Sequence, residues 1–204
     1  MAELGPVVLE GRFVRLEPLA PSHAVPLLAA AQAPEIWTSM PTALTTRAAI
    51  DRWIAEALER AGEGREFAFA VVVREGGRVV GSTRYMDVQA AHRGVEIGWT
   101  WYAPDVWGTA VNPEAKYVLL QHAFEEWGAI RVCLKTDARN LHSQAAIRKL
   151  GAHYEGTLRS HRIRQDGTAR DSVLYSIVRQ EWPEVRAALE QRIDAAGINL
   201  PRHL

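Results

Sequence analysis

The spacing of apolar residues predicts several helices along the chain. The clearest run occupies residues 47–61, where apolar side chains recur every three or four positions: Ile50, Trp53, Ile54, Ala57 and Leu58. Thr45 or Thr46 is suited to cap this run, and Gly62 and Gly64 stop it. Similar spacing predicts further helices over residues 22–32, 112–127, 141–150 and 183–196, with Ser22 as the cap of the first.

Alternating or continuous apolar runs predict strands between these helices. Residues 67–73 are apolar at every position, as expected of a strand with both faces buried. Residues 92–102 alternate, which predicts one apolar face made of Val95, Ile97, Trp99 and Trp101. A bent strand or hairpin is predicted over residues 7–19, and further strands over residues 78–87, 131–136, 153–164 and 169–178. Asp166-Gly167 is a strong hairpin signal between the last two.

This order of elements predicts an α+β fold. We expect one mixed, mostly antiparallel central sheet of about six to seven strands, flanked by helices. With 204 residues and no internal repeat or linker, the chain is expected to form a single domain over residues 1–204. Its core would cover about residues 11–181, followed by a C-terminal helix over about residues 183–196.

The composition excludes several classes of function. The 24 basic and 24 acidic residues balance, so neither nucleic acid nor an anionic membrane is an expected partner. The histidines lack the spacing of metal ligands and there is one cysteine, Cys133, so no metal site is expected. Residues 1–11 show no leader pattern and no apolar stretch is long enough to span a bilayer. We therefore expect a soluble, cytoplasmic protein.

The stretch that begins at Asp105 predicts an anion site. Asn112 is a favourable N-cap and Pro113 suits the first helical position, so a helix is expected to start there after a loop of small residues. The free backbone N–H groups and the helix dipole at such a start favour an anion. A phosphate-bearing ligand is therefore expected.

A set of short motifs in a fixed order resembles one enzyme superfamily. The motifs are Gly11-Arg12 with Leu16-Glu17-Pro18-Leu19, Glu96-Ile97-Gly98-Trp99, Trp107-Gly108, Asn140-Leu141-His142-Ser143, Leu150-Gly151-Ala152 and Glu155-Gly156. Each is weak alone, but their order and spacing resemble the GNAT superfamily of acyl-CoA-dependent N-acetyltransferases. Within it, the RimJ/RimL-type group, which acetylates protein N-termini and in some members small amines, is most similar.

The resemblance implies acetyl-CoA as the donor. It implies that the loop before the third helix holds the CoA diphosphate through Trp107, Gly108, Thr109, Ala110, Val111 and Asn112, with charge added by Lys116. It also places the strand with Trp99 and Trp101 beside the thioester, and Asn140 at the pantetheine arm. The family pattern Gln/Arg-x-x-Gly-x-Gly/Ala is altered at Trp107, Ala110 and Asn112. This departure keeps open a degenerate, non-catalytic CoA-binding sensor or scaffold domain.

The same resemblance suggests catalytic residues. The position of the usual tyrosine acid is Ile147, so Ser143, a serine found in RimL-type members, is the candidate that protonates the thiolate. Glu96 and His161 are alternative bases for the amine, because a proton acceptor is needed before attack. Simple roles remain open for these residues: helix capping for Asn140 and Ser143, an ion pair for Glu96, and a solvent-facing position for His161.

The acceptor is expected to be a primary amine. An N-terminal α-amino group needs only a modest base, because its pKa is about 8. The resemblance implies a pocket near the loop after the first helix, so Trp37, Met40 and Arg84 are candidate acceptor-binding residues. A basic patch is expected on the last hairpin, from Arg159, Arg162, Arg164 and Arg170. The family also implies direct attack in a ternary complex, and a homodimer as a possible partner arrangement.

Overall fold

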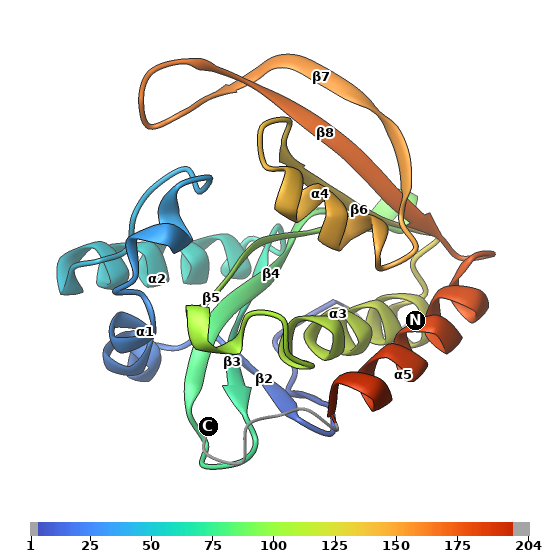
Figure 1. The fold of residues 1–204 in the computed structure, drawn as a ribbon, viewed down its shortest axis with the longest axis horizontal. Coiled ribbons are helices and arrows are strands. Elements are labelled where there is room, and N and C mark those ends of the chain that lie inside the picture. Colours follow the sequence, from blue (N-terminus) through green and yellow to red (C-terminus); the bar gives the residue numbers. More distant parts are fainter. Residues whose placement is uncertain (1–3, 198–204) are drawn as a thin grey trace.

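The computed structural model describes residues 4–197, which form one open sheet of eight strands flanked by five α-helices (Figure 1). The strands are β1 (Leu9–Glu10), β2 (Val14–Pro18), β3 (Phe67–Val73), β4 (Val79–Gln89), β5 (Gly94–Tyr102), β6 (Arg131–Asp137), β7 (His153–Ile163) and β8 (Ala169–Val178). The helices are α1 (Ala24–Ala30), α2 (Arg47–Gly62), α3 (Val111–Gln121), α4 (Leu141–Arg148) and α5 (Trp182–Gly197). Short 3-10 turns include η1 (Pro21–His23), η2 (Pro34–Trp37) and η4 (Pro104–Val106).

The sheet has the strand order β1-β2-β3-β4-β5-β6-β8-β7. Every neighbouring pair is antiparallel except β5 and β6, which are parallel. The predicted α+β class and the mixed, mostly antiparallel sheet are therefore confirmed. The sheet has one strand more than expected, because residues 7–19 form the hairpin of β1 and β2.

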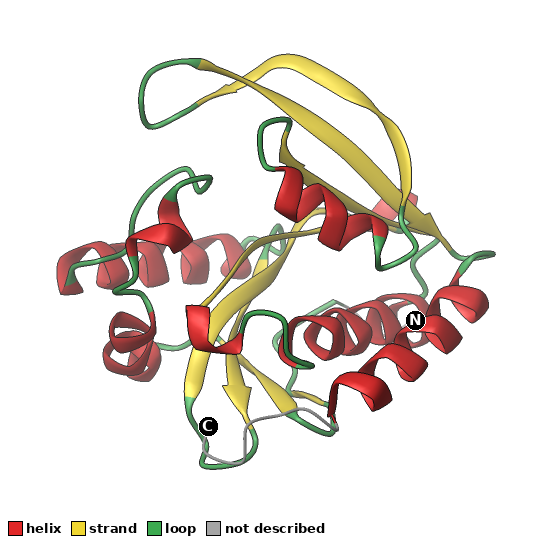
Figure 2. Ribbon diagram, in the orientation of Figure 1, coloured by secondary structure: helices red, strands yellow, loops and turns green. Residues whose placement is uncertain are grey.

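Helices cover both faces of the sheet (Figure 2). One hydrophobic core joins the sheet to α3 and α5, through residues such as Tyr85, Leu119 and Leu189. A second core joins the opposite face to α1 and α2, through residues such as Leu27 and Ile54. The full burial of β3 follows, since its residues alternate between the two cores. Among the described residues, no helix is long and apolar enough to cross a membrane.

Local capping signals located some helix starts and missed others. Thr46 is the N-cap of α2, and its hydroxyl accepts a hydrogen bond from the N–H of Ala49 at 3.2 Å. The predicted cap at Ser22 is wrong, because Ser22 lies inside η1 and α1 starts at Ala24. The predicted cap at Asn112 is also wrong: α3 starts at Val111, with Ala110 as its N-cap. Asn112 therefore lies inside the first turn of α3.

Glu114 links α3 to the first hairpin. Its carboxylate is buried and accepts hydrogen bonds from the backbone N–H groups of Arg12, Phe13 and Val14 at 2.8, 2.6 and 2.7 Å. A Cβ at Gly11 would lie 2.6 Å from this carboxylate, so the turn needs glycine there. One acidic side chain thus satisfies three N–H groups of the β1–β2 turn and fixes the hairpin on α3.

The helix α3 continues into a π-helix, η5 (His122–Trp127), which ends at Gly128 as predicted. Gly128 adopts a left-handed conformation with φ +83°, which favours glycine at a helix end. The hydroxyl of Tyr85 on β4 donates to the carbonyl of Leu119 at 2.5 Å, just before the π-helical segment. A strand side chain thus bonds a carbonyl of α3 next to the point where the helical hydrogen-bond pattern changes from α to π.

The hairpin of β7 and β8 arches over the rest of the molecule (Figure 1). Its register shifts between Tyr154 and Gly156 and again between Leu158 and Arg162, and such bulges bend a strand. The predicted Asp166-Gly167 turn is present, with Gly167 at φ +80°. Most of β7 is exposed, and among the strands of residues 4–197 it is the last in the sheet.

Candidate active site

The sheet opens between its two parallel strands. β5 pairs with β6 at three positions, the last of which joins Glu96 to Cys133. Both strands then continue, β5 to Tyr102 and β6 to Asp137, without further pairing between them. Each strand leads into a helix, α3 after β5 and α4 after β6. The carboxyl ends of parallel strands, next to helix N-termini, are a common position for a ligand.

A β-bulge marks the open edge of β5. Ser82 of β4 pairs with Trp101, and Arg84 pairs with Gly98, so Trp99 and Thr100 together face the single residue Thr83. Trp99 has φ +49°, a conformation that a bulky side chain rarely adopts. Gly98, Trp99 and Thr100 are partly exposed, whereas the first residues of β5 are buried. This part of β5 is therefore accessible and has an irregular backbone.

The bulge makes the predicted single apolar face of this strand wrong. Val95 and Ile97 pack in the core with α3, as alternation predicts. Trp101 packs on the opposite face, in the core with α1 and α2, and Trp99 packs against the same core. The extra residue at the bulge reverses the alternation for the rest of the strand. Trp101 is 3% exposed, so its side chain is part of the core and does not face a ligand.

The loop before α3 presents small residues at the helix start. Gly108 is exposed with φ +76°, and no atom of residues 4–197 lies within 4 Å of the Cβ that another residue would place there. The hydroxyl of Thr109 donates to the carbonyl of Val106 at 2.7 Å and accepts the N–H of Val111 at 3.3 Å. Trp107 is exposed and its indole N–H donates to the carbonyl of Tyr102 at 3.0 Å. Trp107 and Gly108 are therefore open to an anion, whereas Ala110 and Val111 at the start of α3 are buried.

Lys116 does not add charge to this loop. Its side chain is 5% exposed and points into the sheet, where Nζ donates to the hydroxyls of Thr100 at 2.6 Å and Thr83 at 3.2 Å. Burial lowers the pKa of Lys116 to about 7. The predicted role at the diphosphate is thus wrong, because position 116 faces the core side of α3. The amine instead bonds the two threonines at the bulge.

The start of α4 carries the predicted Asn140 and Ser143. Asn140 is the N-cap of α4, and its side-chain oxygen accepts the backbone N–H of Ser143 at 2.9 Å. The capping role that the sequence left open for Asn140 is therefore confirmed. Ser143 is half-buried in the first turn, and its hydroxyl is not needed for the cap. Ile147, one turn later, is buried in the core.

Glu96 forms a buried ion pair where the pairing of β5 with β6 ends. It is 8% exposed and its carboxylate lies 2.6 Å from Nζ of Lys135 on β6. The ion pair that the sequence left open for Glu96 is therefore present, with Lys135 as the partner. Burial raises the pKa of Glu96, while the hydrogen bond and charge of Lys135 oppose the shift. A carboxylate with a raised pKa is a better proton acceptor than an ordinary one, as acid–base catalysis requires.

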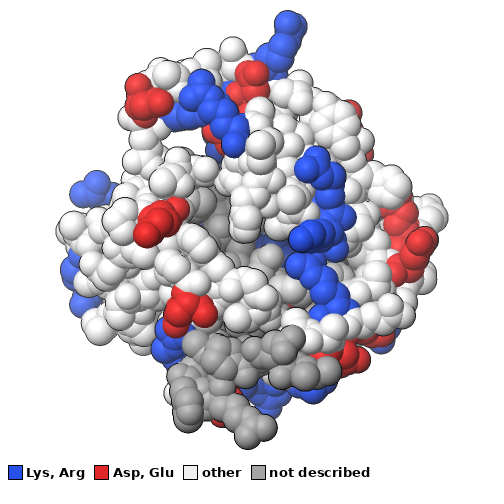
Figure 3. Space-filling model, in the orientation of Figure 1, with Lys and Arg blue, Asp and Glu red and all other residues white. Residues whose placement is uncertain are grey.

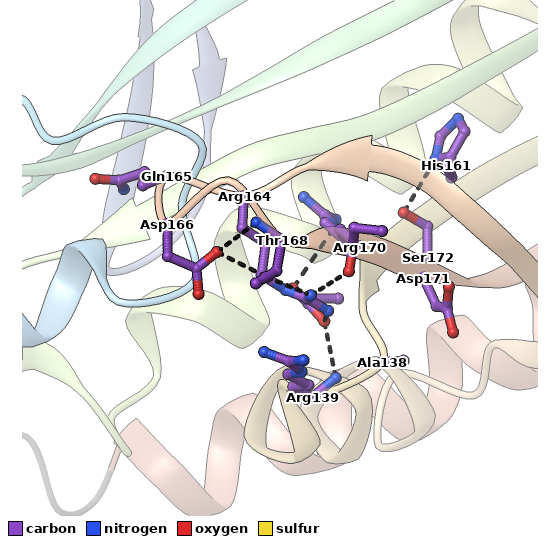
Figure 4. Close-up of polar contacts among 12 residues, drawn as sticks. Ala138, Arg139, His161, Arg164, Gln165, Asp166, Thr168, Arg170, Asp171 and Ser172 are labelled. Carbon is purple, nitrogen blue, oxygen red and sulfur yellow. Dashed lines mark hydrogen bonds and ion pairs between the residues drawn. The ribbon is translucent and has the colours of Figure 1, made fainter.

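His161 lies on β7 above the same region. Its Nδ1 is 3.0 Å from the hydroxyl of Ser172 on β8 (Figure 4). Burial and the positive charges of Arg162, Lys135 and Arg170 lower the pKa of His161. Lys135 and Arg162 also act on Glu96. The structure therefore brings the two candidate bases into one electrostatic environment, on the α1 and α2 side of the sheet.

The hairpin tip is held by Asp137 at the end of β6. Arg164 binds both carboxylate oxygens of Asp137, at 2.7 and 2.9 Å, and Arg170 lies 3.9 Å away. Figure 4 shows Arg164, Arg170 and Thr168 turned toward one another at this point. The hydrogen bond from Arg164 lowers the pKa of Asp137. The predicted basic patch is thus partly neutralised by a carboxylate that the sequence analysis did not single out.

The tip of the hairpin also reaches the loop after α1. The side-chain amide of Gln165 donates to the carbonyls of Trp37 at 3.2 Å and Met40 at 2.7 Å. In Figure 4, Gln165 points away from the Arg164 cluster. Trp37 itself is 5% exposed and packs on Trp101, with 5.2 Å between ring centroids. The Trp37 side chain therefore belongs to the core, whereas Met40 is half-buried beside the hairpin tip.

Three further residues, Arg84 on β4 and Cys133 and Lys135 on β6, lie on the strands near this opening. Arg84 is 1% exposed on β4 and pairs with Glu66. Burial raises the pKa of Cys133 to about 11, so this thiol stays protonated at neutral pH. Lys135 was missed by the sequence reasoning, although it lies two residues from Cys133 and so shares its face of β6. Across residues 4–197, no group of acidic, histidine or cysteine side chains could hold a metal ion.

The surface around the cleft is uneven in charge. Figure 3 shows a hollow near the centre of one face of the molecule, with Lys and Arg side chains gathered along one side of it. These basic side chains lie over the region of α4 and α5 in the orientation of Figure 1. A basic rim beside a hollow favours an anionic ligand, although the chain as a whole carries no net charge.

An open sheet with a bulged strand, a parallel strand pair and two helix starts beside the opening suits an acetyltransferase. The family model described as "Acetyltransferase (GNAT) domain" matches residues 14–153, more than half of the chain. The chain belongs to this family of enzymes. The resemblance suggested by the short motifs is thereby confirmed.

Individual relatives support the same family. A protein of T. thermophilus, described as a candidate acetyltransferase, is 39% identical; the similarity covers 92% of this chain and 97% of that one, with a TM-score of 0.82. RimJ of Mycobacterium smegmatis, in complex with CoA-disulfide, has the same fold, with 23% identity, coverage of 94% and 95%, and a TM-score of 0.78. YdaF of Bacillus subtilis (strain 168), named as a candidate ribosomal N-acetyltransferase, is 29% identical over 52% of this chain and 57% of its own length. The matches span less than two thirds of the curated relatives.

Proposed function

We propose that the protein transfers an acetyl group from acetyl-CoA to a primary amine, by direct attack within a ternary complex. The observation that carries this proposal is the opening between β5 and β6, which lies between the starts of α3 and α4. An extended pantetheine arm fits such an opening, because the unpaired backbone of β5 can hydrogen-bond to it.

The proposed diphosphate site is the loop from Trp107 to the first turn of α3. Gly108 leaves space for close approach, and the N–H groups of Ala110 and Asn112 lie at the positive end of the helix dipole, whereas that of Val111 donates to Thr109. Thr109 shapes this loop through its hydroxyl. Since Lys116 is buried, the loop relies on backbone donors, and the basic side chains along the hollow supply long-range attraction.

The proposed chemistry needs a polarised thioester, an acid and a base. Backbone N–H groups at the open edge of β5, next to the bulge at Trp99, are suited to the developing oxyanion. Ser143, in the first turn of α4, is the proposed donor of a proton to the departing thiolate. Asn140 supports it by fixing the start of α4.

Of the two candidate bases, the geometry supports Glu96 better than His161. It lies on β5, the strand with the open edge, whereas His161 lies on the exposed hairpin. Burial raises the pKa of Glu96, so this pKa is closer to that of an amine than the pKa of an ordinary carboxyl group is. Lys135 keeps the carboxylate oriented at 2.6 Å, and a water molecule between Glu96 and the amine would complete the path.

The acceptor is proposed to be a terminal amine of an extended segment, in particular a protein N-terminus. The hairpin tip is bonded to the loop after α1, so it covers the acceptor side and disfavours a bulky folded partner. The name of YdaF points in the same direction for that relative. A small primary amine is the second candidate, because a covered site also suits a slender molecule.

Two measurements test this function. Acetyl-CoA is expected to raise the melting temperature of the protein, since a ligand that binds only the native state stabilises it. Thiol release should then follow on a panel of N-terminal peptides and small amines. No thermal shift at millimolar acetyl-CoA would contradict the donor assignment. Binding without thiol release on any acceptor would instead favour a non-catalytic CoA-binding domain, consistent with the altered Ala110 and Ile147 positions.

A further inference from the structure

Arg84 is a buried cation on the acceptor side of the cleft. It lies on β4 and pairs across the sheet with Gly98 of β5, next to the bulge at Trp99. Tyr85 packs in the core with α3, so the alternating side chain of Arg84 faces the α1 and α2 side. Glu96 faces the same side, because its neighbour Ile97 packs in the α3 core. Arg84 and the proposed base therefore share one face of adjacent strands.

The guanidinium of Arg84 is fixed on three sides. Its Cζ lies 4.7 Å from the ring centroid of Trp53 and 5.2 Å from that of Trp99. Nη1 binds the carboxylate of Glu66, which is 5% exposed. Two aromatic rings and one carboxylate thus hold the position of this group, and arginine stays charged at neutral pH.

One edge of the guanidinium has no partner. Nε and Nη2 of Arg84 are buried and form no hydrogen bond within residues 4–197. Nε and Nη2 are the two donors on the side edge of an arginine, the pair that binds both oxygens of one carboxylate. Leaving buried donors without an acceptor is energetically unfavourable, and such groups in a native protein call for an explanation.

Two side chains, those of Met86 and Glu96, occupy the space over Gly98 beside Arg84. Gly98 lies opposite Arg84, and a Cβ there would meet an oxygen of Glu96 at 3.3 Å and the sulfur of Met86 at 2.8 Å. The carboxylate of Glu96 thus extends over Gly98. Trp99, which covers Arg84, is partly exposed, while Arg84, Trp53 and Glu66 are buried. A ligand group can reach the edge of Arg84 if the flexible Met86 side chain and the Trp99 ring shift.

We propose that the side edge of Arg84 binds a carboxylate of the acceptor, so that the preferred acceptor is a primary amine with a carboxylate a few bonds away. The amine would lie at Glu96 and the carboxylate at Arg84, with the chain between them over Gly98. Two residues along a strand span about 7 Å, so the two groups must belong to a compact unit. This unit is a free amino acid or the N-terminal residue of an acidic peptide. The inference rests on the proposed function.

Matched ligands test the inference on the unaltered protein. The binding of glycine is compared with that of glycinamide, and that of the peptide Asp-Ala-Ala with Asn-Ala-Ala, by calorimetry with and without CoA. The carboxylate member of at least one pair is expected to bind about tenfold or more tightly, because a charge-assisted bidentate pair is lost in the amide. The pair that discriminates identifies the source of the carboxylate. Equal affinities within both pairs would overturn the inference.

Two variants assign the effect to Arg84. Arg84→Lys keeps the charge but removes the side edge, so discrimination between the matched ligands is expected to disappear. Arg60→Lys is the control, because Arg60 also pairs with Glu66, at 3.6 Å, and is partly exposed. This control should keep the discrimination. Full discrimination in a folded Arg84→Lys protein would place the carboxylate elsewhere and overturn the inference.

The two proposals can fail separately. Thiol release on neutral amines, with no preference for a carboxylate in binding or in kcat/KM, would leave the acetyltransferase proposal intact and remove the role of Arg84. Discrimination between the matched ligands without thiol release would leave the Arg84 site intact and remove the proposed reaction. Because the binding measurement needs no turnover, neither result depends on knowing the natural acceptor.

Discussion

At the scale of single residues, burial decides what Lys116 does. Its amine bonds two threonine hydroxyls, and the pKa of about 7 arises from burial. The unfolded chain has a lysine pKa of about 10.4, so the folded state binds its proton more weakly. The energetic penalty is therefore complete below pH about 7, decreases as pH rises toward 10.4, and is absent above it.

Replacing Lys116 by methionine should remove this penalty. We expect Lys116→Met to raise the free energy of unfolding by about 1–4 kcal/mol at pH 6, and by less at pH 9, because each pKa unit corresponds to about 1.4 kcal/mol. Denaturant unfolding at both pH values measures the difference. Lys149→Met, at an exposed position, is the control. A gain in stability that is equal at both pH values would contradict the electrostatic account.

Ser143 gives a second prediction at this scale. Ser143→Ala is expected to lower kcat by about 10²-fold or more, as for loss of a general acid, with little change in CoA affinity. Its backbone N–H still completes the Asn140 cap, so α4 should stay folded. Thiol release and calorimetry with CoA measure the two effects. His142→Ala, at the exposed neighbouring position, should leave both unchanged, and an unchanged kcat in Ser143→Ala would remove this residue from the mechanism.

The residues that the sequence could assign are those whose role is local. Thr46 and Asn140 were recognisable as caps, because capping involves atoms only three residues away. The side chains of Trp37 and Lys116 could not be placed, because their partners are distant in sequence: Trp101 for one, and Thr83 with Thr100 for the other. Position and residue type alone could not show that these side chains turn into the core.

At the scale of elements, the bulge in β5 is a feature that the apolar pattern of the sequence does not predict. The alternation of Val95, Ile97, Trp99 and Trp101 reads as a regular strand. A bulge adds one residue without changing that pattern, so the face on which Trp101 lies could not be predicted. The strand itself, its neighbours and most helix limits were predictable, because periodicity and turn residues determine them.

Glu114 shows how one helix side chain positions another element. Glu114→Ala removes the acceptor of three backbone N–H groups in the β1–β2 turn, and we expect a loss of about 3–5 kcal/mol in the free energy of unfolding. Glu114→Gln, which keeps one oxygen, should lose less. Chemical denaturation compares both with Glu59→Ala on the exposed face of α2. A loss no larger than that of the control would show that water replaces the carboxylate.

At the scale of the whole molecule, the hairpin joins two parts of the chain that are distant in sequence. Its tip is bonded to Asp137 through Arg164, and to the loop after α1 through Gln165. The sequence predicted the hairpin and its turn but not these contacts, since they join residues up to 128 positions apart. The overall class could thus be predicted, whereas the contacts of the hairpin tip required the structure.

The Gln165 contacts give a prediction about access to the site. Gln165→Ala removes both bonds to the Trp37 and Met40 carbonyls, so the tip should open more often while the rest of the fold is retained. We expect faster amide exchange confined to the hairpin tip, and a KM for the acceptor raised several-fold with kcat for a saturating acceptor little changed. Gln180→Ala, at an exposed position just after β8, is the matched control. If exchange at the tip and the acceptor KM both match the control, the hairpin is held by Arg164 and Asp137 alone, and the contact of Gln165 with the loop plays no part in covering the acceptor side.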